Sequence, residues 1–136
     1  MALLVWMPLT TDLRQQGASS AAAITLNGAA TNTSGKIGSC YSFDGSDDYI
    51  SIDSAALRSA IAGSSTPMSI AAWIYHADAT RGIIFGDYGL SGAIGFNIEL
   101  TTSHTIRFYW NGSPDYTIAA MNIGASTWAH ICFTYN

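Results

Sequence analysis

The sequence predicts an all-β protein, an antiparallel β-sandwich of the jelly-roll type with about ten strands. Short runs of alternating apolar and polar residues recur along the chain, and a period of two is the side-chain repeat of a strand. Turn-forming residues separate these runs about every eight to twelve positions. Strands do not alternate with long helical segments, so a parallel βαβ sheet is not predicted.

The first half of the chain contains four predicted strands and one short predicted helix. The strands are Ala2–Pro8, Ala22–Leu26, Cys40–Phe43 and Tyr49–Ile52. The last two are predicted to form a hairpin around the polar turn at 44–46. The helix is predicted near Ser54–Ile61, because Leu57 and Ile61 are four residues apart.

The second half contains six predicted strands. They are Met68–Tyr75, Gly82–Asp87, Ala93–Leu100, Thr105–Trp110, Tyr116–Ala120 and Ala129–Tyr135. Within the first of these, Ile70 and Ile74 lie on one face, and Trp73 and Tyr75 lie on the other. Apolar groups on both faces indicate a central strand, so we expect Trp73 to be buried. Phe43, in an earlier alternating run, is expected to be buried as well.

Composition fits one domain over residues 1–136, since no internal repeat or linker interrupts the pattern. The chain has 136 residues, of which 49% are hydrophobic and 10% charged, and its net charge is -4. It has only five Lys and Arg residues, too few for the clustered cations that bind phosphates, so a nucleic-acid partner is not predicted. A cation, a neutral glycan or another protein is compatible with this charge.

The apolar start of the chain is predicted to be neither a membrane span nor a secretory signal. The run Ala2–Met7 ends before Pro8, far short of a bilayer-spanning length, and no basic residue precedes it. Cys40 and Cys132 fall in predicted strands. Two reduced, packed thiols are preferred here over a disulfide.

Three segments carry a family resemblance. They are Ser42–Ile52 (SFDGSDDYISI), Met68–Tyr75 (MSIAAWIY) and Trp128–Asn136 (WAHICFTYN). In this order and spacing they resemble the laminin-G-like branch of the concanavalin A-like lectin/glucanase superfamily. The resemblance implies a β-sandwich that binds glycans or proteins and does no chemistry of its own.

The resemblance covers roughly residues 36–136 and stops before the closing strands of the family. It implies a domain that is incomplete at its C-terminus, with an open sheet edge that pairs with another copy or with a different chain of an assembly. The alternative is that Ala2–Pro8 folds back to cover the gap. Residues 4–9 and 36–41 show a weaker similarity to bacteriophage tail and other virion-surface proteins. That similarity implies a location on a virion or an extracellular surface.

Catalytic motifs are absent from the sequence, and we predict that the protein is not an enzyme. Glycoside hydrolysis needs two carboxylates that flank a cleft, and glucanases of the superfamily carry E-x-D-x-x-E on one strand. Glu99 is the only glutamate, and it is expected to be an outward strand residue. No G-x-S-x-G nucleophile motif is present.

The three histidines do not suggest a zinc site, because no Cys or His lies at metal-ligand spacing from them. His130 matches a strand position of the family, where a structural role is expected. His76 and His104 fall in predicted turns and are expected to be solvated.

Acidic residues crowd the turn between Cys40 and Tyr49. Asp44, Asp47 and Asp48 lie there, and Asp53 follows closely. Carboxylates in a loop are calcium ligands, but Asp is also favoured in tight turns for bonds to its own backbone. A calcium site at Asp44, Asp47 and Asp48 and simple turn chemistry both remain open.

Aromatic and polar residues at the later turns form the predicted ligand-binding site. These residues are Tyr88, Arg107, Trp110, Asn111, Asp115 and Tyr116. Aromatic faces stack on pyranose rings and polar groups bind hydroxyls, although packing in the sandwich is the competing role for each aromatic. The predicted function is therefore a non-catalytic recognition module for a glycan or cell-surface ligand, displayed on a larger assembly such as a phage virion. The alternative is a structural subunit-contact domain with no small ligand.

Overall fold

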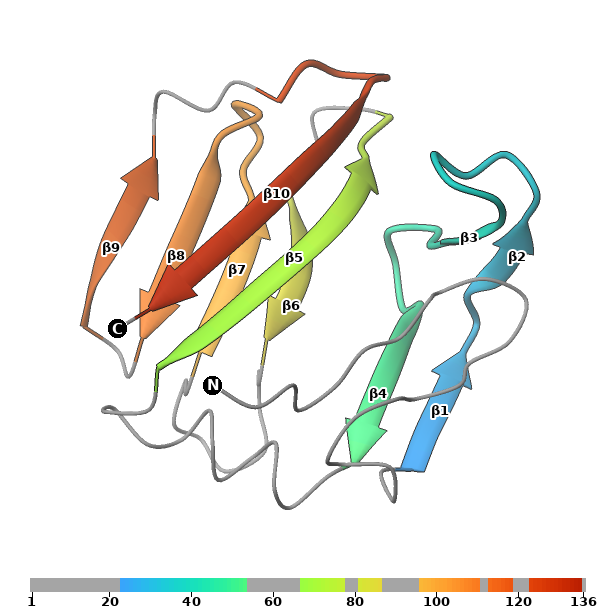
Figure 1. The fold of residues 1–136 in the computed structure, drawn as a ribbon, viewed down its shortest axis with the longest axis horizontal. Helices are drawn as coiled ribbons and strands as arrows, with labels where there is room; N and C mark the ends of the chain where they lie inside the picture. The colour runs from blue at the N-terminus through green and yellow to red at the C-terminus, as the bar shows by residue number, and fades with distance from the viewer. Residues whose placement is uncertain are drawn as a thin grey trace. The chain divides into compact units, whose positions relative to one another are not determined.

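A computed structural model describes residues 23–53, 67–77, 81–86, 96–110, 113–118 and 123–135. Within these ranges the chain forms ten strands, all pairing antiparallel, and no helix (Figure 1). The predicted all-β antiparallel class is confirmed. The predicted strand Ala2–Pro8 and the predicted helix Ser54–Ile61 lie outside the described residues. The chain divides into two compact units, Met1–Pro67 and Met68–Asn136.

No helix in the described part of the chain is long and apolar enough to cross a membrane.

The first unit contains two short antiparallel ladders. Both are formed between the same two segments of the chain, residues 23–32 and residues 40–53. The strands are β1 (Ala23–Asn27), β2 (Ala30–Asn32), β3 (Cys40–Ser42) and β4 (Tyr49–Asp53). β1 pairs with β4, ending at Asn27 opposite Tyr49, and β2 pairs with β3, starting at Ala30 opposite Ser42. Residues 43–48 therefore leave the ladder as a loop, which we call the acidic loop.

The predicted hairpin between Cys40–Phe43 and Tyr49–Ile52 is wrong, because β3 and β4 pair with β2 and β1 rather than with each other. Aspartate side chains close the acidic loop by accepting the backbone N–H groups of Asp44 and Ser46, and the strands on either side of it pair with β2 and β1 instead. Phe43 lies in this loop, outside both ladders, and its exposure of 49% shows that the prediction of burial was wrong.

The second unit contains two sheets. β5 (Met68–Tyr75) and β10 (Trp128–Tyr135) form one antiparallel pair, in register from Tyr75 opposite Trp128 to Met68 opposite Tyr135. The other sheet has the order β6-β7-β8-β9, and its strands are Gly82–Gly86, Phe96–Leu100, Ile106–Trp110 and Ser113–Ile118. In Figure 1, β5 and β10 cross in front of this four-stranded sheet.

The core of the second unit lies between these two sheets. Phe108 of β8 and Phe133 of β10 meet with their ring centroids 4.3 Å apart. Ile98 of β7 is opposite Phe108 in the register, and both are buried. Ile131, two residues before Phe133, is buried on the same side of β10. The alternating apolar positions of each sheet thus face the other sheet, as in a β-sandwich.

Trp73 does not join this core, and the prediction of its burial was wrong. The even-numbered residues of β5 from Ile70 to Ile74 are half-buried toward the core, so the period of two turns Trp73 and Tyr75 away from it. Their exposures are 42% and 49%. β5 is therefore packed on one face in the described structure, rather than on two.

Candidate functional site

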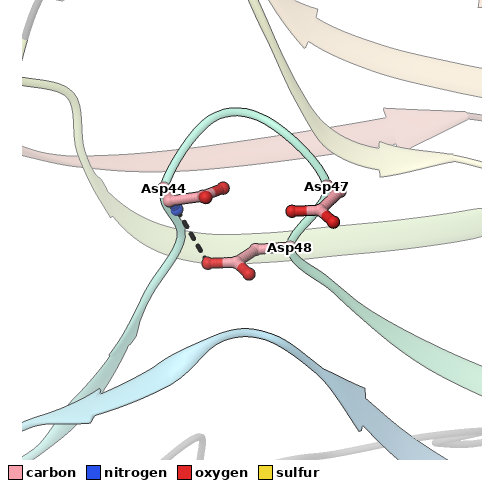
Figure 2. Close-up of side chains that lie close together, drawn as sticks. All are labelled: Asp44, Asp47 and Asp48. Atoms are coloured by element: carbon pink, nitrogen blue, oxygen red, sulfur yellow. Dashed lines mark hydrogen bonds between the residues drawn. The ribbon is translucent and has the colours of Figure 1, made fainter.

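The acidic loop brings three carboxylates together. One carboxylate oxygen from each of Asp44, Asp47 and Asp48 lies within 4.8 Å of the other two, and Figure 2 shows the three side chains gathered at the mouth of the loop. Calcium binds oxygens at about 2.3–2.6 Å, so two ligands of one ion lie up to about 5 Å apart. One cation could therefore contact all three carboxylates.

Two of these carboxylates also shape the loop. Oδ2 of Asp48 accepts a hydrogen bond of 2.8 Å from the backbone N–H of Asp44, and Oδ1 of Asp44 accepts one of 2.8 Å from that of Ser46 (Figure 2 shows the first). Each carboxylate uses one oxygen for the turn, and its second oxygen makes no hydrogen bond to the described residues. Turn chemistry and cation binding are thus compatible in the same loop.

The strand junction opposite the loop holds it in place. Gly28 has a positive φ of 74°, and a Cβ atom built at this position would overlap the carboxylate of Asp48. The side-chain amide of Asn27 donates a 3.4 Å hydrogen bond to the carbonyl of Asp47. The absence of a side chain at Gly28 is therefore what lets Asp48 reach its position.

A second candidate site lies on β5 and β10, on the side turned away from the core. Trp73 lies opposite His130 and Tyr75 opposite Trp128 in the register. The ring centroids are 5.0 Å apart in the first pair and 5.5 Å in the second, with interplanar angles of 52° and 54°. We call these four residues the outer aromatic face. Three of them are exposed and Trp128 is half-buried.

The outer aromatic face was not among the predicted site residues. Its signal is nevertheless present in the sequence, because Trp73 and Tyr75 alternate with core positions of one strand, and Trp128 and His130 alternate with core positions of another. The missing information was the register that sets the two pairs side by side.

Glu99 lies on the face of β7 turned away from the core, as an outward strand residue does, but it is buried rather than exposed. Its side chain is 0% exposed and is held by two arginines. Nη2 of Arg81 lies 2.6 Å from Oε2, Nε of Arg81 donates to the same oxygen at 2.8 Å, and Nη1 of Arg107 lies 3.3 Å from Oε1. Charge pairing makes this burial tolerable. It also places Arg107, a predicted ligand-binding residue, against a carboxylate of its own chain.

The structure leaves the remaining predicted ligand-binding residues untested. Tyr88 and Asn111 lie outside the described residues. Trp110 ends β8, and Asp115 and Tyr116 lie in β9, which gives their strand positions but not their side chains. The predicted set remains a prediction.

The predictions for the cysteines and histidines were partly right and partly wrong. Both cysteines are free thiols, as preferred, but Cys132 is exposed on β10 rather than packed. His130 lies in a strand, as expected. His76 and His104 are half-buried and contact each other, so the expectation that both are solvated was wrong. They meet because the end of β5 and the turn before β8 come together.

These features define a β-sandwich with an acidic loop and an exposed aromatic sheet face. Residues 44–136 match the laminin-G-like family model described as the concanavalin A-like lectin/glucanases superfamily. The match covers more than half of the chain, and the chain belongs to this family. No curated protein and no solved structure matches it.

Membership gives a coarse statement of function. Laminin-G-like modules commonly bind glycans or proteins and are generally non-catalytic. The matched range contains most of the acidic loop and both strands that carry the outer aromatic face. Both candidate sites therefore belong to the part of the chain that carries the family pattern.

Proposed function

We propose that this chain is a non-catalytic recognition module that binds a glycan on the outer aromatic face. One observation carries the proposal: Trp73 and Tyr75 are exposed side by side on one strand, each against an aromatic partner on β10. The two residues, 42% and 49% exposed, are adjacent on one strand face, and a contiguous exposed apolar patch marks a binding surface more often than a single exposed ring does.

The chemistry of the face fits a neutral sugar. The two tilted ring pairs offer flat apolar surfaces to the C–H face of a pyranose, and the indole N–H, phenol and imidazole groups offer hydrogen bonds to its hydroxyls. Cross-strand pairing holds the rings in place, which lowers the entropy lost on binding. The net charge of -4 favours a neutral or cationic ligand over an acidic one.

The absence of catalysis is part of the proposal. The single glutamate is fully buried and its two oxygens contact arginine side chains. A general acid or nucleophile must reach the glycosidic bond and needs a second carboxylate across a cleft. Glu99, buried and paired with arginines, does not meet the first requirement.

A glycan array followed by calorimetry on the best oligosaccharide tests the glycan site. We expect binding with a change in tryptophan fluorescence, and its loss in Trp73→Ala and Tyr75→Ala. Ile83→Ser is the matched control, because Ile83 is an equally exposed apolar residue on β6. Equal binding by all three variants would overturn this site.

We further propose that the acidic loop binds calcium. Asp44, Asp47 and Asp48 supply up to three carboxylate ligands, and water would complete the six to eight oxygens that calcium takes. Calcium should raise the melting temperature by binding the native state. An Asp47→Asn variant should lose this rise, because it removes one of the three carboxylate ligands. The loop itself should keep its shape, because the Asp47 side chain makes no hydrogen bond in the loop. An identical melting curve in excess calcium and in chelator would contradict the proposal.

Two glycine variants sharpen the calcium test. Gly28→Ala and Gly38→Ala strain similar backbones, with φ of 74° and 70°, but only the first crowds Asp48. Both should destabilise the fold by about 1–3 kcal/mol. Only Gly28→Ala should also weaken calcium binding. Equal calcium affinity in the two variants would show that calcium does not bind through Asp48 in the acidic loop.

The second candidate function is a contact domain in a larger assembly. The same exposed aromatic face favours it, since Trp and Tyr are enriched at protein interfaces. Light scattering on the isolated chain distinguishes the two candidates. A dimer that Trp73→Ala converts to monomers, together with an empty glycan array, would support the assembly role. A virion or extracellular location is a prediction under either function.

A further inference from the structure

We infer that His76 and His104 form a binding site for a divalent transition metal ion such as Zn²⁺. The two residues are 28 positions apart, and neither lies in the acidic loop or on the outer aromatic face. His76 directly follows β5, and His104 ends the turn between β7 and β8. The site therefore joins the two sheets of the second unit at one end.

The geometry of the two rings carries the inference. Their Nδ1 atoms lie 3.4 Å apart, and the rings are close to perpendicular at 74°. Zinc binds imidazole nitrogen at about 2.0–2.1 Å, so two ligands at a tetrahedral angle are about 3.3–3.4 Å apart. The same spacing also allows a long hydrogen bond between the rings when one of them carries its proton at Nδ1. The two nitrogen atoms are therefore already at the separation that two ligands of one ion require.

Both backbones are fixed by bonds that do not involve the rings. The carbonyl of His76 accepts a 2.7 Å hydrogen bond from the N–H of Ser126. His104 donates its N–H to the carbonyl of Thr101 at 3.0 Å and accepts at its own carbonyl from Ile123 at 3.0 Å. The two ligands are thus brought together before any ion arrives, which reduces the ordering cost of binding.

His104 also occupies a backbone conformation that side chains seldom adopt. Its φ is 57°, in the left-handed region, where glycine is usual and asparagine, aspartate and histidine are the commonest other residues. Glycine or asparagine would also fit this turn, so the turn alone does not require the histidine. Its imidazole is what that position gains, and it faces the imidazole of His76.

The chemistry limits the ligand to a metal that accepts nitrogen donors. Imidazole suits zinc, copper and nickel, whereas calcium and magnesium prefer oxygen. Among the described residues, no third His, Cys, Asp or Glu joins the pair. The protein would supply two ligands, and water would take the remaining positions. Such a site binds more weakly than a closed structural zinc site with four protein ligands.

Calorimetric titration of the untagged full chain with zinc chloride at pH 7.5 tests the site. Calcium in excess blocks the acidic loop during the titration. We expect one zinc ion per chain, and we expect His76→Gln and His104→Asn each to weaken binding about tenfold or more. Asparagine is chosen at 104 because it tolerates the positive φ. The control is His130→Asn, which removes the third histidine and should leave zinc affinity unchanged.

Spectroscopy on the unmodified protein keeps the test valid if a variant fails to fold. Zinc should shift the ring proton resonances of His76 and His104 but not those of His130. Zinc binding should also weaken as the pH falls, because protons compete with the metal ion for nitrogen ligands. No saturable zinc binding, unchanged affinity in both the His76 and His104 variants, or resonance shifts confined to His130 would each overturn the inference.

Discussion

The two sheets of the second unit differ in the burial of the faces that are turned away from the core. On β7, the face turned away from Ile98 carries Asn97 and Glu99, which are almost fully buried. On β5, the face turned away from the core carries Trp73 and Tyr75, which are exposed. Polar groups are covered on one sheet and aromatic rings are uncovered on the other. A simple rule of apolar inside and polar outside would have assigned both faces the other way.

Charge pairing and ring pairing explain the difference. Glu99 is stable under cover because Arg81 and Arg107 neutralise it and take its hydrogen bonds. Trp73 and Tyr75 are partly exposed to solvent. Each can tolerate this exposure because part of its ring packs against an aromatic ring on β10. The charges of the first face are therefore used in ion pairs within the chain, and the second face is the surface that we propose binds a ligand.

The largest loss of stability is expected for a substitution on the inner faces, where the two sheets pack against each other. Phe108→Ala should lower the free energy of unfolding by about 3–5 kcal/mol, since a buried ring that contacts Phe133 is lost. Urea unfolding measures the loss. A loss below about 1 kcal/mol would show that the two sheets do not pack through this pair.

The buried charge gives the next effect. Replacing Arg81 and Arg107 together with methionine should cost about 3 kcal/mol, because the buried Glu99 carboxylate would lose both of these ion pairs. Adding Glu99→Gln to the double variant should restore part of the stability. If the triple variant is no more stable than the double variant, the carboxylate charge is not what the arginines compensate.

Trp73→Ala should have a smaller effect on stability, about 1 kcal/mol, because much of the ring is already in water. The same variant should abolish glycan binding under the proposed function. A cost as large as that of Phe108→Ala would mean that the outer aromatic face is a packed surface rather than a binding surface.

The smallest effect is expected at Cys132, which lies on the same outer face of β10 as His130 and is exposed. Cys132→Ser should change stability by less than about 0.5 kcal/mol, as is usual for surface positions. The Cys132 thiol should also react readily with a maleimide in the folded protein. Slow labelling together with a large loss of stability would show that this end of the face is covered.

The sequence predicted the features that depend on periodicity. The alternation in Met68–Tyr75 predicted both the strand and its two faces, and the bounds of the last strand were nearly right. It could not predict which face is covered, because Trp73 fits a buried or an exposed position equally well. The burial of Glu99 was not predicted because it depends on Arg81, which lies 18 residues away, directly before β6.

Pairing partners were the other limit of the sequence. A short polar turn between two alternating runs is the usual signal of a hairpin, but the aspartates close the loop through their own side chains. The approach of His76 to His104 was equally hidden, because nothing local to either residue shows that the two turns meet. Long-range placement follows from strand order and register, which the pattern of one strand does not contain.

The interrupted ladder of the first unit has a consequence for engineering. Both ladders end at the base of the acidic loop, at Ser42 on one side and Tyr49 on the other. The loop thus leaves and rejoins the same antiparallel track, so its length is not fixed by the strand register. Closing a longer loop costs only about 0.6 kcal/mol for each doubling of its length. Residues 43–48 can therefore serve as an insertion point for a displayed peptide or a randomised library.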